Sequence, residues 1–109
     1  MDHYEIIMTP DSIDDLLELR NYIVDVLLAR ETALKLIRQI KDEISKLSEF
    51  PARIKPIEQE PWKSRGVRRM LCKNYYVYFR IDENTKRVYI LNVIYSRSDQ
   101  LNILKAKQI

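Results

Sequence analysis

Several residue types are scarce in this 109-residue sequence, and each shortage removes a class of site. The chain has one cysteine, Cys72, and one histidine, His3. These are too few for an internal disulfide, a zinc site or a haem site. A single glycine, Gly66, cannot supply a glycine-rich phosphate-binding loop. No apolar run approaches the ~18 residues that span a bilayer. We therefore expect no metal, no cofactor and no membrane anchor.

The composition is that of one folded domain covering residues 1–109. Hydrophobic residues make up 46% of the chain and charged residues 32%, whereas disordered chains have fewer apolar residues. A length of 109 residues leaves room for one modest core. The first residues have neither the basic flank nor the apolar run of a signal peptide. Together with the lone cysteine, this predicts a cytoplasmic protein.

Charge is divided unevenly along the chain. Residues 1–50 contain six Lys and Arg against eleven Asp and Glu, a net charge of −5, whereas residues 51–109 contain thirteen against five, a net charge of +8. Eight of the cations are crowded together: Arg53, Lys55, Lys63, Arg65, Arg68, Arg69, Lys73 and Arg80. A solvated basic face explains this pattern, and so does a surface that binds nucleic acid, the ribosome or an acidic protein tail.

The first half of the sequence predicts a short strand and then a helix. Side chains alternate in character from Tyr4 to Met8, as in a strand. Thr9 and Pro10 supply a capping hydroxyl and a first-turn proline, which start a helix. The broad apolar face of this helix consists of Ile13, Leu16, Leu17, Leu19, Tyr22, Ile23, Val24, Val26 and Leu27. Such a wide face predicts packing against more than one neighbour.

A second helix follows a change of phase at residues 28–31. Its apolar residues recur at spacings of three and four: Ala33, Ile37, Ile40, Ile44 and Leu47. Phe50 and Pro51 end it, because the residue before a proline resists helical geometry. We therefore predict a long antiparallel helical hairpin with about five turns in each helix.

The second half predicts an antiparallel meander. Residues 51–66 hold three of the four prolines and form a surface loop. Strand patterns then cover residues 67–72, 75–81 and 88–95, joined by short polar turns. The spacing of Leu101 and Leu104 indicates a short final helix in the tail from Asp99 to Ile109. The expected class is α+β, with an N-terminal strand, a helical hairpin, a three-stranded antiparallel meander and a C-terminal helix.

The middle strand separates two kinds of side chain. Tyr75, Val77, Phe79 and Ile81 are apolar and should pack on the helices, whereas Tyr76, Tyr78 and Arg80 should line an open face of the sheet. A two-residue turn at Lys73 and Asn74 pairs Cys72 with Tyr75 and brings Arg69 opposite Tyr78. A slip of one residue would bring Arg68 there instead. Aromatic rings interleaved with guanidinium groups suit nucleic acid and acidic protein alike.

The remaining polar and sulfur-bearing residues have structural interpretations. Cys72 is expected to be a buried, inert thiol and Trp62 a packing anchor for the loop. Asp14 and Asp15 are adjacent on a helix and do not face each other, so both are expected to be solvated charges. Without a metal site or a nucleophile–base pair, any catalysis here depends on cations and tyrosines.

The sequence resembles the RelE/ParE superfamily of bacterial toxins over residues 4–104. The matching segments, in order, are Thr9–Pro10, Asp14–Leu16, Asn21–Ile23, Leu47–Pro51, Gly66–Arg69, Tyr75–Ile81 and Ile94–Asp99. Each segment is degenerate alone, but their order and spacing are typical of the superfamily. The resemblance implies a sheet that carries a helical hairpin. It also implies neutralisation by a cognate antitoxin, in a toxin–antitoxin hetero-oligomer.

Two activities occur in this superfamily. RelE-like members cut messenger RNA in the ribosome, whereas ParE-like members inhibit DNA gyrase. The arginine that RelE-like enzymes carry early in the middle strand falls on Tyr76, and residues 101–109 contain no Tyr or His to match their C-terminal aromatic residue. Arg69 and Arg97 do match basic positions of the family. The length of the hairpin and the ending Arg97–Asp99 favour the ParE branch.

Three hypotheses follow from this resemblance. In the first, the toxin binds gyrase through Arg68, Arg69, Arg80 and Arg97. In the second, it is a metal-independent endoribonuclease, in which Arg69 and Arg97 hold the scissile phosphate and Tyr76 or Tyr78 moves a proton. In the third, it is an attenuated toxin that acts as an antitoxin-binding scaffold or co-repressor.

Overall fold

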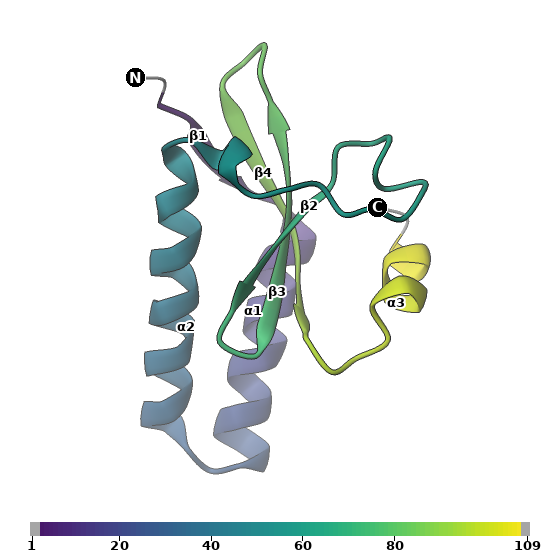
Figure 1. Cartoon of the computed structure of the whole chain (residues 1–109). Coiled ribbons are helices and arrows are strands. Elements are labelled where there is room, and N and C mark those ends of the chain that lie inside the picture. The colour runs from purple at the N-terminus through teal and green to yellow at the C-terminus, as the bar shows by residue number, and fades with distance from the viewer. Residues whose placement is uncertain (1–2, 108–109) are drawn as a thin grey trace.

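The structure, a computed structural model, describes residues 3–107 and has the predicted order of elements (Figure 1). The elements are β1 (Glu5–Met8), α1 (Pro10–Asn21) with a π-helical extension (Tyr22–Val26), α2 (Arg30–Ser45), β2 (Arg68–Cys72), β3 (Tyr75–Asp82), β4 (Arg87–Tyr95) and α3 (Gln100–Lys107). Short 3₁₀ turns at Lys46–Ser48 and Pro51–Arg53 lead out of α2. The α+β class, the helical hairpin, the meander and the final helix are thus confirmed.

The four strands form one mixed sheet in the order β1-β4-β3-β2. The meander of β2, β3 and β4 is antiparallel, as predicted, whereas β1 pairs in parallel with the first half of β4. Because β1 is only four residues long, it covers β4 from Arg87 to Ile90. The second half of β4 therefore extends beyond its neighbour, and the start of α1 lies there.

Each face of the sheet has its own hydrophobic core. The helical hairpin covers one face, where Ile40, Ile44 and Leu47 of the α2 region pack against Val77 and Phe79. The other face was expected to be open, and that expectation is wrong. Trp62 and Ile57 of the loop and Leu104 of α3 close over Tyr78 and Ile94, and Figure 1 shows α3 on the side of the sheet away from α2. Trp62, 2% exposed, is the predicted packing anchor.

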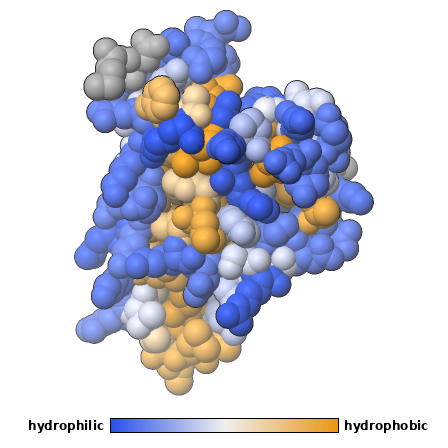
Figure 2. Space-filling view, viewed as in Figure 1, coloured by the Kyte–Doolittle hydropathy of each residue, from blue (hydrophilic) through white to orange (hydrophobic). Residues whose placement is uncertain are grey.

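As predicted, the apolar face of α1 packs against more than one neighbour, β4 and α2, but it is only partly covered. Leu16 and Ile23 are buried, but Ile13 and Leu17 are about half exposed. The hairpin ends in an apolar tip that faces solvent, made of Tyr22, Val26, Leu27 and Leu28. Figure 2 shows this tip as the hydrophobic base of the molecule. No helix among residues 3–107 is long and apolar enough to cross a membrane.

Cys72 should react slowly in the folded protein. Its side chain is buried in the first core, and burial, followed by the negative charge of Glu43, raises the pKa of the thiol. Because the thiolate is the nucleophile, we expect iodoacetamide at pH 8 to alkylate the native protein at least about tenfold more slowly than the unfolded chain. Mass spectrometry over time measures both rates. Equal rates would contradict the buried position.

Candidate functional site

The register of the β2–β3 hairpin is the predicted one. Cys72 pairs with Tyr75, and Arg69 lies opposite Tyr78, so the alternative slip that placed Arg68 there does not occur. Lys73 takes a positive φ of 56° in the two-residue turn, which lets the chain reverse between the strands. Arg69 therefore shares a face of the sheet with the alternating tyrosines of β3.

On this face Arg69 is exposed and Tyr76 lies half-buried beside it. The guanidinium carbon of Arg69 lies 4.1 Å from the centre of the Tyr76 ring, a stacked cation–π contact. The side chain of Arg69 also lines a depression of about 230 Å³ with residues 55–59, which bring the cation Lys55 to the same place. Lys55 was noted only as part of the basic cluster. The loop that carries it crosses beside Arg69 because Pro56 bridges to Arg68.

Tyr78, expected on an open face, is buried. Its ring is 0% exposed, and its hydroxyl donates to Oε1 of Gln100 at 2.7 Å. Burial raises the pKa of Tyr78, and the nearby Arg69 guanidinium opposes this only in part. Gln100 also donates to the carbonyls of Tyr95 (2.7 Å) and Ser98 (2.9 Å), so it fastens the start of α3 to the end of β4. The sequence carried no signal for this role of Gln100.

The Tyr78→Phe variant should lose about 1 kcal/mol of stability at neutral pH, the net contribution of one hydrogen bond. The difference should shrink in alkali. Tyrosine ionises near pH 10.0 when unperturbed, and the buried phenol resists ionisation. Ionisation therefore favours the unfolded wild type as pH rises above about 10, whereas the variant has no phenol there. Urea unfolding at pH 7 and pH 10.5 measures this, and a constant difference would contradict it.

The other predicted arginines do not gather around Arg69. The side chain of Arg68 points back to the loop and donates to the carbonyls of Ile54 and Ala52, a structural role. Arg80 is exposed and lies 5.9 Å from the ring of Tyr89 on the neighbouring strand. Arg97 is exposed in the turn after β4 that Gln100 holds in place. Three of the four arginines that were predicted to bind the target therefore face solvent: Arg69, Arg80 and Arg97.

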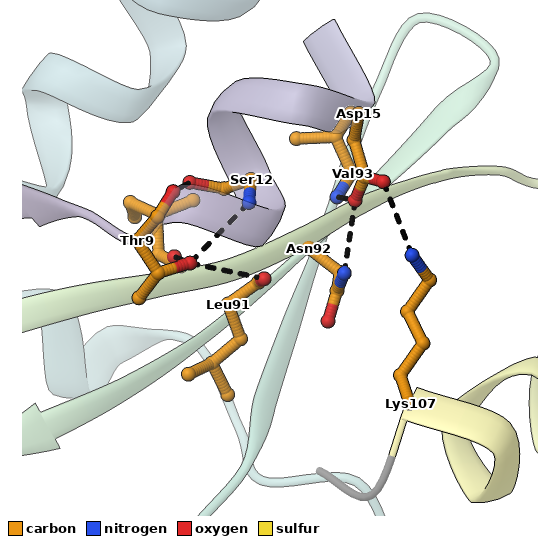
Figure 3. Close-up of polar contacts among 8 residues, drawn as sticks. Thr9, Ser12, Asp15, Leu91, Asn92, Val93 and Lys107 are labelled. Carbon is orange, nitrogen blue, oxygen red and sulfur yellow. Dashed lines mark hydrogen bonds and ion pairs between the residues drawn. The ribbon is translucent and has the colours of Figure 1, made fainter. Parts of the chain in front are cut away.

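A bulge in β4 interrupts its pairing with β3. Tyr78 pairs with Asn92 but Phe79 pairs with Ile90, so Leu91 is an extra residue. The hydroxyl of Thr9, the N-cap of α1, donates to the carbonyl of Ile90 at 2.6 Å. The same hydroxyl lies 3.2 Å from the carbonyl oxygen of Leu91, the extra residue of the bulge (Figure 3).

The carboxylate of Asp15 is a largely shielded structural acceptor, so the expectation that it is a solvated charge is wrong. Its side chain is 9% exposed. One carboxylate oxygen accepts from the Asn92 side chain and from the Val93 backbone N–H, each at 2.9 Å, and the other lies 3.3 Å from Nζ of Lys107 (Figure 3). The Val93 N–H lies on the part of β4 that β1 does not reach. Asp15 thus closes the sheet edge and ties α1 and α3 to β4. Asp14 is exposed, as expected.

Within residues 3–107, no three His, Cys, Asp or Glu side chains come together as a metal site. The exposed cations of this surface, two of which lie over tyrosine rings, can bind an anionic or acidic partner.

Comparison with known proteins places the chain among bacterial toxins. The sequence profile of the ParE toxin of type II toxin–antitoxin systems, parDE, matches residues 6–100. A search of curated proteins returned no match.

Solved structures share the fold. A chain of the chromosomal ParDE toxin–antitoxin system from P. aeruginosa is 22% identical, with a TM-score of 0.71 over 87% of this chain and 98% of that one. The RelBE2 toxin–antitoxin complex from Mycobacterium tuberculosis contains a chain that is 23% identical, with a TM-score of 0.58 over 85% and 98%. A free double-arginine mutant of the E. coli toxin RelE is 13% identical, with a TM-score of 0.65 over 98% of both chains.

Proposed function

Because the chain belongs to the ParE toxin family of type II toxin–antitoxin systems, we propose that it arrests growth by binding DNA gyrase and that its cognate antitoxin prevents this. The RelE/ParE resemblance of the sequence, and its preference for the ParE branch, agree with the family match. The toxin class and an antitoxin partner follow from the family, whereas the gyrase target and growth arrest are the proposal.

The buried position of Tyr78 is the observation that favours gyrase binding over RNA cleavage. A ribonuclease of this fold without a metal needs side chains that move protons at the scissile phosphate. The Tyr78 hydroxyl is 2.7 Å from Gln100 inside the second core, and its raised pKa opposes ionisation at neutral pH. It cannot reach a substrate while α3 is in place. The three exposed arginines, Arg69, Arg80 and Arg97, are suited to binding rather than to proton transfer.

Expression from a tightly controlled promoter tests the proposal. We expect growth to stop, messages to stay intact and the chromosome to be broken or unreplicated. The purified protein should also inhibit supercoiling by gyrase, with inhibition relieved by the antitoxin. Intact supercoiling together with intact DNA during arrest would overturn the gyrase target. The absence of any arrest would instead favour the attenuated scaffold.

One observation favours ribosome-dependent RNA cleavage as the alternative. Tyr76 remains half-buried, with the Arg69 guanidinium stacked 4.1 Å above its ring, so one tyrosine and one cation do share an accessible site. In this alternative Arg69 and Arg97 hold the phosphate and Tyr76 transfers the proton. Cuts at defined codon positions in translated messages, mapped by primer extension during arrest, would establish it.

A further inference from the structure

The outer side of β2 presents backbone groups that are placed for pairing. Cys72 and Tyr75 flank a two-residue turn, so they exchange both backbone hydrogen bonds of their pair. Successive residues of a strand direct these groups to opposite sides, and Leu71 therefore directs its N–H and C=O away from β3. β2 is also the last strand on its side of the sheet. An edge of this kind accepts an added strand.

The loop of residues 51–66 covers only the beginning of this edge. The N–H of Ile57 donates to the carbonyl of Val67 at 3.0 Å, and Pro56 bridges to Arg68. Val67 is four positions before Leu71, so the outward direction of its carbonyl agrees with the alternation along the strand. Within residues 3–107, no strand or bridge pairs with the outer side of β2 beyond Arg68. The edge is therefore open around Leu71.

An apolar side chain stands exposed on this open edge. Leu71 is 59% exposed. It lies opposite Tyr76 of β3, which in turn lies opposite Ile94 of β4, so the three side chains form a row across the sheet. In Figure 2 a hydrophobic strip crosses the region of β2 between hydrophilic margins. An apolar side chain placed opposite Leu71 by an added strand would extend this row.

The neighbouring position on the same face carries positive charge. Arg69 is two residues before Leu71, and its guanidinium is exposed beside the ring of Tyr76. Lys55 and Glu58 line the same depression as Arg69, so two cations stand against one carboxylate. On an added strand, the residue two positions from the partner of Leu71 lies opposite Arg69. A carboxylate suits that position, because it can pair with the guanidinium.

The opposite face of the edge borders a polar groove. A depression of about 470 Å³ lies between the end of β2 and the C-terminal half of α2. Cys72 and Lys73 line it from the sheet. Its other wall includes Glu43 and Lys46, which form an ion pair at 2.9 Å. An added strand would place its alternate side chains over these groups, so its segment should be polar on this face and apolar and acidic on the other.

We propose that the open edge of β2 is the docking site for the target: an extended segment of gyrase pairs with β2 as a fifth strand, with an apolar residue opposite Leu71 and a carboxylate opposite Arg69. The inference rests on the proposed function and adds the surface and the mode of binding. A second copy of the chain fits less well, because it brings two cationic edges together. Nucleic acid could pair with Arg69 but would leave the backbone groups and Leu71 unused.

The Leu71→Lys variant tests the apolar row. Its affinity for purified gyrase holoenzyme, measured by biolayer interferometry, should fall at least about tenfold, because the apolar contact is lost and a further cation is added. Leu34→Lys makes the same change at a leucine of α2 that is 45% exposed, and its affinity should stay within about twofold of the wild type. Wild-type affinity in Leu71→Lys, or equal losses in both variants, would overturn the docking site.

The same variant separates the other possible occupants of the edge. Leu71→Lys should keep the circular dichroism of the wild type and should bind the antitoxin of the same operon within about twofold. Loss of antitoxin affinity without loss of gyrase affinity would assign the edge to the antitoxin. A wild-type dimer in sedimentation that Leu71→Lys dissociates would assign it to a second copy. A gain in gyrase affinity would indicate contact with bound DNA, since the variant adds a positive charge. Each of these three results overturns the proposal.

Hydrogen exchange tests the backbone pairing without any substitution. The Leu71 amide should exchange fast in the free toxin and at least about tenfold more slowly in the gyrase complex. The Met70 and Cys72 amides should be slow in both states, because they donate to β3. Unchanged exchange at Leu71 in a saturated complex would overturn the added strand.

Failure of this inference is distinct from failure of the proposed function. If the wild type inhibits supercoiling by gyrase and Leu71→Lys is equally potent, the proposed function stands and the docking site at β2 is lost. If the wild type neither binds nor inhibits gyrase, the proposed target is lost and the docking site with it.

Discussion

Replacing Arg69 and Arg97 together with alanine is expected to relieve growth arrest and leave the fold intact. Both side chains are exposed, so the cost in stability should stay near the ~0.5 kcal/mol typical of surface changes, with up to ~1 kcal/mol more for the lost contact between Arg69 and Tyr76. Arginines at an interface are often hot spots worth about 2 kcal/mol each, or ~30-fold in affinity. Loss of two such contacts should abolish arrest at ordinary expression levels.

Colony counts after induction measure this effect, with equal protein levels checked by immunoblotting. The control is Lys35→Ala with Arg38→Ala, which removes two exposed cations from α2 and changes the net charge equally. We expect the control to remain toxic. Growth arrest by the Arg69 and Arg97 double variant at wild-type protein level would remove these residues from the target surface. Relief by both double variants would point to net charge alone.

The Asp15→Ala variant should lose about 2–4 kcal/mol of stability, because it leaves buried donors without an acceptor. Asn92 is 1% exposed, so its amide has no access to water once the carboxylate is gone. The Val93 N–H and the Lys107 ammonium lose the same acceptor. A domain of this size is stable by only about 5–15 kcal/mol. Denaturant unfolding monitored by circular dichroism measures the loss.

Two further variants serve as controls for the loss of stability in Asp15→Ala. Asp14→Ala removes the adjacent exposed carboxylate and should change stability by less than about 0.5 kcal/mol. Asp15→Asn keeps an oxygen for the Val93 N–H but not the charge beside Lys107, so it should fall between the two. An alanine variant as stable as the wild type would mean that water replaces the carboxylate and that the network is dispensable.

Features that depend on local sequence could be predicted. The hairpin helices follow from spacing, and the N-cap at Thr9 is made as expected, with its hydroxyl accepting from the Ser12 N–H at 3.3 Å. The pairing of Cys72 with Tyr75 follows from the length of a two-residue turn. Burial of Cys72 follows from its place in an apolar strand. In each case the neighbours in sequence decide the structure.

Features that depend on distant segments could not be predicted. The alternation of side chains along β3 predicts the face on which Tyr78 lies. It does not show that α3 and the loop carrying Trp62 cover that face. In the sequence Asp15 looks like any carboxylate near the start of a helix, and only the bulge at Leu91 and the short length of β1 bring it to a bare sheet edge. The roles of Arg68 and Gln100 are likewise set by loop backbone and by α3. The arrangement of the candidate site therefore depends on tertiary contacts, which the periodicity of the sequence does not reveal.

The parallel pairing of β1 with β4 also determines how early the sheet can form during synthesis of the chain. Residues 5–8 must wait for residues 87–90 before their pairing can form, so the ribosome makes most of the chain before the sheet closes. Contacts of such long sequence separation form late and slowly. The α1–α2 hairpin, by contrast, can form from local contacts while the chain is still attached. We expect nascent chains stalled before residue 87 to be digested readily by protease. The four-stranded sheet of a newly made chain therefore stays incomplete until translation is nearly finished.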